Sequence, residues 1–172
     1  LMSELALREG GDTESLQEIH RLAGEAAESM RGIIWLVREG DAPKLTSLVE
    51  AMRQSAAALL KSIDWKLDLP SSDNAATASL EFHRQVFLLF REAIHNIARH
   101  AKASGVKIKI FWQSKRLHLH IEDDGCGFDV NAINAGNGLA NLRHRAEAIG
   151  GMLCITSVPG KGTHITLEAP LS

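Results

Sequence analysis

The sequence has 172 residues, which suits one domain with a modest appendage and is too short for two full enzyme domains. Hydrophobic residues make up 45% and charged residues 23%, which excludes a largely disordered or low-complexity chain. No apolar run approaches the roughly 18–20 residues that span a bilayer, and the net charge of −2 gives no reason to expect a nucleic-acid groove. We therefore expect neither nucleic acid nor a membrane as a partner of these residues.

Residues 1–63 are predicted to form a helical domain. The apolar positions between residues 16 and 37 alternate steps of three and four, a heptad seam typical of a helix packed lengthwise on other helices. A second amphipathic helix follows over residues 45–63. Because a helix with only one seam to bury is unstable alone, we expect a partner chain or a further helix to cover it. An intramolecular hairpin that caps its own domain stays open.

Residues 64–172 are predicted to form a second, mixed domain. Short alternating apolar runs indicate strands, and a long amphipathic pattern indicates a helix over residues 80–102. The expected strands are 65–69, 106–112, 117–123, 152–157 and 164–168, with a further helix at 139–149. This order predicts an α+β fold: a two-layer sandwich in which a mixed sheet of about five strands carries helices on one face.

The two cysteines, Cys126 and Cys154, have no CxxC spacing and no histidines at zinc-ligand intervals. This pattern indicates a reduced, cytosolic setting without a structural metal. Cys126 lies in a glycine-rich segment and is predicted to be exposed. Cys154 is predicted to point inward from its strand into the core.

The helix at 80–102 combines an apolar face with a polar row. Glu92, Asn96 and Arg99 fall together on one face, which we place opposite the apolar face. A carboxylate and an amide oxygen can hold Mg²⁺ or polarise a nucleophile, and an arginine can bind phosphate. Taken alone, such a row is more often the solvated face of a helix. The apolar face, expected to pack on the sheet, consists of Val86, Phe90, Ala93, Ile94, Ile97 and Ala101.

Three glycine-containing strings follow along the chain. Asp123 ends an alternating strand and leads into Gly125 and Gly127, where a ligand could approach the backbone closely. Residues 136–139 open a helix whose N-terminal amides suit a phosphate, and residues 160–163 form a tight turn. Neither the spacing of a dinucleotide-binding fingerprint nor that of a P-loop is present. Each string alone also fits a plain turn.

Taken in order, four strings resemble the ATP-binding boxes of the GHKL superfamily, which have the Bergerat fold. They are EAIHNIARHA (92–101), DDGCGF (123–128), GNGL (136–139) and GKGT (160–163). Within the superfamily, REAIHNIARHAKAS, GNGLANLRHRAEAIGG and PGKGTHITLEAPL look like the sensor histidine kinases of the nitrate-sensor and DesK-like branch. SMRGIIWLVREGD looks like the end of the second helix of their dimerisation and phosphotransfer bundle. The ATP-binding resemblance covers about residues 64–172.

The resemblance implies roles for the polar residues of the helix at 80–102. Asn96 would coordinate the Mg²⁺ that bridges the ATP phosphates. Glu92 would polarise the nucleophile or hold a metal-bound water, so that Glu92 and Asn96 form the implied catalytic pair. Arg99 matches a basic position that contacts phosphate, and His100 is assigned to the ATP site with it.

The other three boxes supply the remaining implied contacts. Asp123 would accept a hydrogen bond from the adenine amino group, and Gly125 and Gly127 would let the base approach. Thr163, preceded by Gly162, would support the contact between Asp123 and adenine. The lid over the triphosphate would be shaped by Gly136, Gly138 and Leu139.

The implied function is that of the catalytic ATP-binding portion of a two-component sensor histidine kinase. It would bind ATP with Mg²⁺ and transfer the γ-phosphate to a histidine on a dimerisation helix, for onward transfer to a response regulator of the NarL-like type. The whole protein would form a homodimer through the helical bundle. This portion would be cytoplasmic, and the full-length protein would be attached to the inner membrane.

The acceptor histidine of this branch is followed by an acidic residue, whereas His20 is followed by Arg21. We therefore interpret His20 as a surface histidine and expect the acceptor helix to lie outside this chain, which should then not autophosphorylate alone. Two other hypotheses stay open. One is a different GHKL-type ATPase that drives conformational change, and the other is a non-catalytic nucleotide-sensing or dimerising module.

Overall fold

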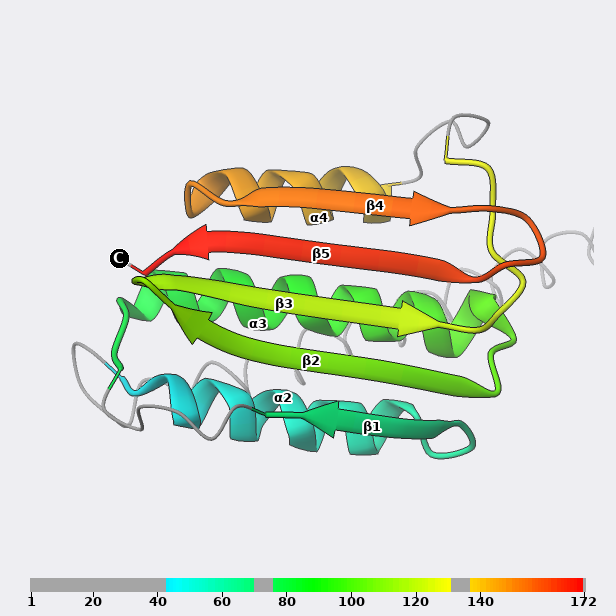
Figure 1. Ribbon diagram of the computed structural model, residues 1–172, viewed down its shortest axis with the longest axis horizontal. Helices are drawn as coiled ribbons and strands as arrows, with labels where there is room; N and C mark the ends of the chain where they lie inside the picture. Colours follow the sequence, from blue (N-terminus) through cyan, green and yellow to red (C-terminus); the bar gives the residue numbers. More distant parts are fainter. Residues whose placement is uncertain (1–42, 70–75, 131–136, 172) are drawn as a thin grey trace, which may run out of the picture. The chain divides into compact units, whose positions relative to one another are not determined.

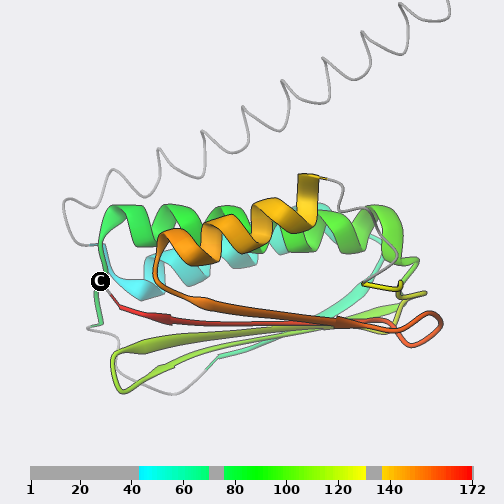
Figure 2. The same cartoon turned by 90° about the horizontal axis from the view of Figure 1, so that it is seen from above.

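A computed structural model describes residues 43–69, 76–130 and 137–171 (Figure 1). In these ranges five strands form one sheet, and the helices lie on the same face of it (Figure 2). The predicted α+β fold with a mixed sheet and helices on one face is confirmed. The heptad seam over 16–37, His20 and Gly136 lie outside the described residues.

The sheet has the strand order β1-β2-β3-β5-β4. β1 runs parallel to β2, and the other neighbours are antiparallel. Parallel neighbours need a crossover connection, which α3 provides. The strands are β1 (Asp64–Asp68), β2 (Gly105–Gln113), β3 (Arg116–Asp123), β4 (Met152–Ser157) and β5 (Thr163–Pro170). The helices are α2 (Leu45–Leu59), α3 (Leu80–Asn96) and α4 (Asn137–Ala148). None of the helices in the described ranges has the length and apolar character needed to cross a membrane.

The core lies between α3 and the inner face of the sheet. Along β2 and β3 the buried side chains recur at every second position, the period expected of strands with one covered face. The apolar helix face predicted to pack on the sheet is buried, with at most 9% of any member exposed. Ser79 begins α3 by accepting a hydrogen bond from the N–H of Phe82 (3.2 Å).

α2 packs beside α3 and buries Leu48 and Met52 completely or nearly so. At its start, Nε2 of the buried His83 lies 3.2 Å from the carbonyl oxygen of Lys44. The predicted helical domain of residues 1–63 includes this helix, whereas in the structure α2 packs on α3 of the domain that follows.

α3 does not continue as an α-helix to residue 102. Its last turn, Ile97–Ala101, widens into a π-helical turn, and Lys102 then adopts a left-handed conformation with φ of 51°. The carbonyl oxygen of Ala101 accepts a hydrogen bond from the N–H of Cys126 (2.7 Å). Single π-helical turns are rare and recur at functional sites. This one holds the loop after β3 against the end of the helix.

The prediction for Cys154 is wrong, because its side chain is exposed. β4 lies at the edge of the sheet, where Met152, Cys154 and Thr156 are exposed and the residues between them are half-buried. The half-buried set includes Ile155 and Ser157. The predicted alternation along this strand is therefore correct, but the positions predicted to point inward are the ones that point outward.

Candidate active site

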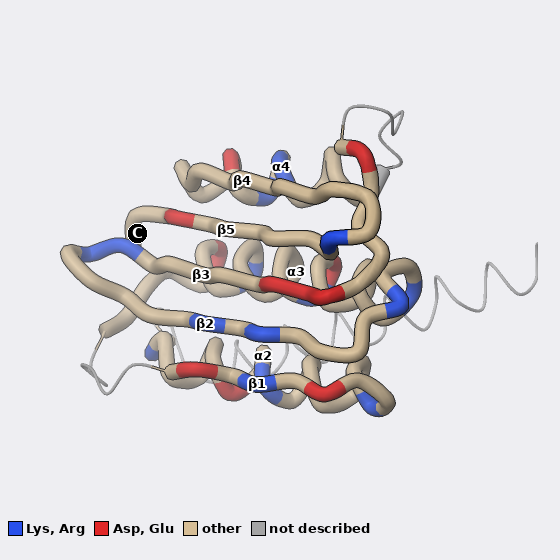
Figure 3. Tube along the Cα trace, turned by 45° about the vertical axis from the view of Figure 1, so that its right-hand side comes forward, with Lys and Arg blue, Asp and Glu red and all other residues tan. Residues whose placement is uncertain are grey.

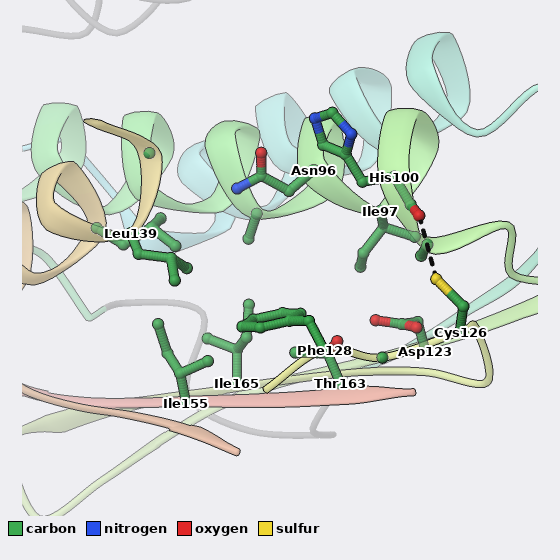
Figure 4. Close-up of a pocket in the computed structure, with 15 residues that line it drawn as sticks. Asn96, Ile97, His100, Asp123, Cys126, Phe128, Leu139, Ile155, Thr163 and Ile165 are labelled. Carbon is green, nitrogen blue, oxygen red and sulfur yellow. Dashed lines mark hydrogen bonds between the residues drawn. The ribbon is translucent and has the colours of Figure 1, made fainter. Parts of the chain in front are cut away.

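A cavity of about 490 Å³ opens between the end of α3, the start of α4 and the strands β3, β4 and β5. This volume falls within the range of small-molecule sites. Asn96 and His100 line the cavity from the helix side, and Asp123 and Thr163 line it from the sheet side (Figure 4). The larger apolar side chains of the lining are Ile97, Phe128, Leu139, Leu142, Ile155 and Ile165.

Asp123 is the buried acid of the cavity, with only 4% of its surface exposed. Its Oδ1 accepts a hydrogen bond from the N–H of Gly125 (2.9 Å), and Thr163 donates to the same carboxyl group from its side chain and backbone. Burial nevertheless raises the pKa of Asp123 above its ordinary value. A carboxyl group kept in such surroundings is costly for the fold, which indicates a role in binding a ligand.

Asp124, the next residue, has a different role. The acidic stretch at the end of β3 is visible in Figure 3, but Asp124 is exposed and does not belong to the lining of the cavity. Its Oδ1 accepts hydrogen bonds from the N–H groups of Ser104 and Gly105, both at 2.8 Å, and its Oδ2 accepts one from Ser104 Oγ at 2.6 Å. These hydrogen bonds lower the pKa of Asp124. Asp124 therefore fixes the start of β2 and leaves Asp123 for the ligand.

Two glycines let the backbone close around Asp123. A Cβ atom on Gly125 would collide with the carbonyl oxygen of Ala101. Gly162 has φ of +75° and lies against the carbonyl oxygen of Asp123, where a side chain would be strained and crowded. Both glycines belong to the predicted site and shape it through the backbone, whereas Gly127 lines the cavity directly.

Asn96 lies on the cavity wall beside Ala93 and Ile97, so the prediction that it faces away from them is wrong. The reason is helical geometry: positions 93, 96 and 97 are related as i, i+3 and i+4 and share one face. The half-buried Glu92 lies next to Gly138 at the start of α4, where Gly138 and Leu139 join the lining.

The structure does not bring Arg99 to the cavity. Arg99 is exposed and absent from the lining, whereas its neighbour His100 is included. A π-helical turn holds more residues than an α-helical turn, so side chains within it point in other directions than α-helical geometry predicts. Arg99 therefore leaves the polar row predicted for Glu92, Asn96 and Arg99. Cys126, exposed as predicted, lines the cavity and donates from Sγ to the carbonyl oxygen of His100 (3.4 Å).

Sequence reasoning missed the apolar part of the site. Phe128, Ile155 and Ile165 line the cavity on the sheet side, and Ile155 is the register partner of Ile165 across β4 and β5. The predicted phase of β4, with Cys154 pointing inward, places its neighbour Ile155 on the outer face, so this prediction does not assign Ile155 to the site. That Ile155 and Ile165 border one cavity also depends on the strand order, which the sequence does not state.

The fold and this site define an ATPase domain. The chain belongs to the histidine kinase-, DNA gyrase B- and HSP90-like ATPase family, whose model matches residues 83–172. Its relatives include sensor histidine kinases. It is 32% identical over 163 residues to the sensor histidine kinase LiaS of Bacillus subtilis, covering 91% of this chain and 43% of LiaS.

A second relative is the signal transduction histidine-protein kinase/phosphatase UhpB of Salmonella typhimurium. It is 29% identical over 176 residues, covering 99% of this chain and 34% of UhpB. The chain thus spans less than half the length of these two relatives. Among solved structures, the histidine kinase domain of the Erythrobacter litoralis EL346 blue-light activated histidine kinase matches with a TM-score of 0.68 at 21% identity. That match covers 84% of this chain and 74% of the other, and it supports the fold.

Proposed function

We propose that this domain binds Mg-ATP in the cavity and transfers the γ-phosphate to a histidine on a dimerisation helix. The observation that carries the proposal is the buried Asp123, whose carboxyl group points into an apolar cavity lined on its helix side by Asn96 and His100. A base that carries a hydrogen-bond donor fits the part of the cavity at Asp123. Phosphates fit the polar part that Asn96 and His100 line. The family match and the sensor kinase relatives support this reading.

Adenine is the base whose chemistry fits the Asp123 end. Its 6-amino group can donate to the Asp123 carboxylate, while Ile97, Phe128 and Ile165 offer apolar surface to its ring. The close backbone approach at Gly125 and Gly127 leaves room for the ring edge. Asp123 would thus read the base, and Thr163 would hold Asp123.

The triphosphate would extend toward the start of α4. Gly138 and Leu139 lie in the first turn of this helix, where free backbone N–H groups favour anions. His100 lines the same cavity and can donate to a phosphate oxygen. We do not assign Arg99 to this group, because it is exposed outside the lining.

The residues at this end also fit Mg²⁺. In the described ranges no group of three or more His, Cys, Asp or Glu side chains is placed to hold a metal by itself. Mg²⁺ in phosphoryl-transfer sites is bound through one or two protein oxygens together with substrate phosphates. The Asn96 amide oxygen would hold the ion directly and Glu92 would hold it through water. The ion would neutralise phosphate charge.

Phosphoryl transfer needs positioning and charge stabilisation more than covalent help from the protein. Glu92, half-buried beside Gly138, would polarise the attacking imidazole by accepting its ring proton. Asn96 and His100 would hold the phosphates in line with that nucleophile. The γ-phosphoryl bond to the β-phosphate oxygen breaks as the bond to the imidazole nitrogen forms, and ADP leaves.

Residues 1–63 would belong to the helical part of such a kinase. We propose that they include the second helix of a dimerisation bundle, that the whole protein is a homodimer, and that its phosphate passes to a response regulator of the NarL-like type. The nitrate-sensor and DesK-like branch is the proposed subgroup, which the similarity to UhpB supports. The domain would work in the cytoplasm.

Calorimetric titration with a non-hydrolysable ATP analogue, with and without Mg²⁺, tests this function. Asp123→Ala should weaken binding by about 1.5–3 kcal/mol, the range for a hydrogen bond to a charged group. Glu122→Ala is the matched control, because Glu122 is adjacent in β3 and exposed. Unchanged affinity in Asp123→Ala would overturn the assignment of the cavity.

A further inference from the structure

Ser157, the last residue of β4, connects the two loops that flank Asp123. Its Oγ lies 2.9 Å from the backbone nitrogen of Phe128, in the loop after β3. The same Oγ lies 2.8 Å from the carbonyl oxygen of Gly162 and 3.1 Å from Oγ1 of Thr163, at the start of β5. One half-buried hydroxyl therefore contacts three groups, and two of them, in Phe128 and Thr163, belong to residues that line the cavity.

The direction of these hydrogen bonds follows from the chemistry of the partners. The Phe128 N–H can only donate, and the Gly162 carbonyl oxygen can only accept. Ser157 Oγ must therefore accept from Phe128, and it shares its single proton between the carbonyl oxygen of Gly162 and Thr163 Oγ1 as a three-centre hydrogen bond. Thr163 then keeps its own proton, which it donates to the Asp123 carboxyl group. The result is a chain of hydrogen bonds that runs from Phe128 to Asp123.

We propose that Ser157 is a positioning residue that determines the specificity of the cavity for a base carrying a 6-amino group. By engaging Gly162 and Thr163, Ser157 keeps the Thr163 hydroxyl turned toward Asp123. Asp123 is thereby held in one orientation, with an oxygen left to accept from the base. The inference rests on the proposed function, because it assumes that Asp123 binds adenine.

Loss of the Ser157 hydroxyl has defined consequences. The Phe128 N–H loses its acceptor, and the Gly162 carbonyl loses a donor. The Thr163 hydroxyl becomes free to turn toward Gly162 instead of Asp123. Since hydrogen bonds in a chain strengthen one another, the bond to the Asp123 carboxylate weakens even though Ser157 does not touch it.

The test compares ATP with purine riboside triphosphate, which differs from ATP only by lacking the 6-amino group. Calorimetric titration of the 172-residue chain in Mg²⁺ buffer gives both affinities. Ser157→Ala should weaken ATP binding about tenfold, equivalent to about 1.4 kcal/mol, and change binding of the analogue less than about twofold. Ser157→Thr keeps the hydroxyl and should restore ATP binding. Thr156→Ala removes an exposed hydroxyl from the same strand and should change neither affinity.

The outcomes separate the two proposals. If Ser157→Ala weakened the binding of ATP and of the analogue equally, Ser157 would have a general structural role and not a specificity role. Unchanged ATP affinity in Ser157→Ala would also overturn the specificity role. If Asp123→Ala weakens ATP binding while Ser157→Ala does not, only the inference about Ser157 is wrong. If Asp123→Ala binds ATP as the parent chain does, the proposed cavity itself is wrong. Thermal unfolding of each variant, with Ser157→Thr as the folded reference, identifies any loss that comes from misfolding.

Discussion

The Glu92 carboxylate lies against the backbone of Gly138, so closely that a Cβ atom on Gly138 would stand 2.9 Å from Glu92 Oε1. The same Cβ atom would stand 3.7 Å from Nδ2 of Asn96. Gly138 is the second residue of α4. The first turn of α4 therefore borders Glu92 and Asn96, the two side chains that we propose for catalysis. The small size of Gly138 leaves them the room that they occupy.

Gly138→Ala should slow phosphoryl transfer while leaving the fold intact. Alanine favours a helix over glycine by about 1 kcal/mol, so the free energy of unfolding should not fall. The added methyl group forces the Glu92 carboxylate to move, and misplacement by about 1 Å can cost about 100-fold in rate. The rate would be measured with an acceptor helix supplied on an extended chain.

Asn141→Ala is the control for Gly138→Ala. Asn141 is exposed on α4, and its substitution also raises helix propensity without touching Glu92. It should leave the transfer rate unchanged. A Gly138→Ala variant that transfers phosphate at the parental rate would show that the position of Glu92 does not matter.

Asp123→Asn should stabilise the protein near neutral pH. The pKa of Asp123 is raised in the folded state, chiefly by burial, so its contribution to stability is fully present below the ordinary value of 3.8 and is lost as the pH rises through the folded value. Asparagine resembles the protonated carboxyl group and avoids that loss. The gain in the free energy of unfolding should therefore grow as the pH rises from 3.8 and then level off, as urea unfolding at several pH values would show.

Asp124→Asn should have the opposite effect and serves as the comparison. Hydrogen bonds from Ser104 and Gly105 lower the pKa of Asp124, so its contribution is present above 3.8 and is lost as the pH falls through the folded value. The variant should be less stable than the parent chain near neutral pH and approach it in acid. If Asp123→Asn and Asp124→Asn changed the free energy of unfolding in the same direction over this pH range, the different roles assigned to the two residues would be wrong.

Much of this fold follows from periodicity in the sequence. The change from a helical period to strict alternation marks α3, β2 and β3, and it identifies the helix face that packs on the sheet. The ordered strings place Asn96, Asp123 and Thr163 around one site because each occurs where an element begins or ends. The structure brings these three residues to the same cavity.

The remaining features depend on geometry that the sequence does not encode locally. The π-helical turn at Ile97–Ala101 changes which side chain reaches the cavity, so His100 lines it and Arg99 does not. The phase of β4 is weakly determined because its outer side chains are apolar or small, as Met152 and Cys154 show. Ser157 went unnoticed because its three partners come together only when β4 and the loop after β3 are in place.

Asn96→Ala should weaken Mg²⁺-dependent binding more than binding without the ion. Asn96 is half-buried on the cavity wall and carries no core packing comparable to that of Ile94, so the fold should survive. Loss of one oxygen ligand should reduce the enhancement of ATP affinity by Mg²⁺ and slow phosphoryl transfer. Paired titrations with and without Mg²⁺ measure the enhancement. If Mg²⁺ increased the ATP affinity of variant and parent equally, Asn96 would not be a ligand of the ion.

The 172-residue chain should bind ATP without phosphorylating itself. The acceptor must be an accessible imidazole that can come in line with the γ-phosphate. His20 is followed by Arg21 and lacks the neighbouring acidic residue that would orient its ring and raise its basicity. Incubation with γ-labelled ATP and Mg²⁺, followed by a test for acid-labile label, measures the reaction.

An extended chain that carries an acceptor helix should become labelled under the same conditions, and Glu92→Gln in that chain should remove most of the label. Glu92 accepts the ring proton in the proposed reaction, and the amide of glutamine cannot do so at neutral pH. The chain with His20→Ala should behave as the parent does. Stoichiometric acid-labile phosphate on His20 would instead identify residues 16–37 as the acceptor helix. An extended chain that binds ATP but acquires no label would favour a nucleotide-sensing module over a kinase.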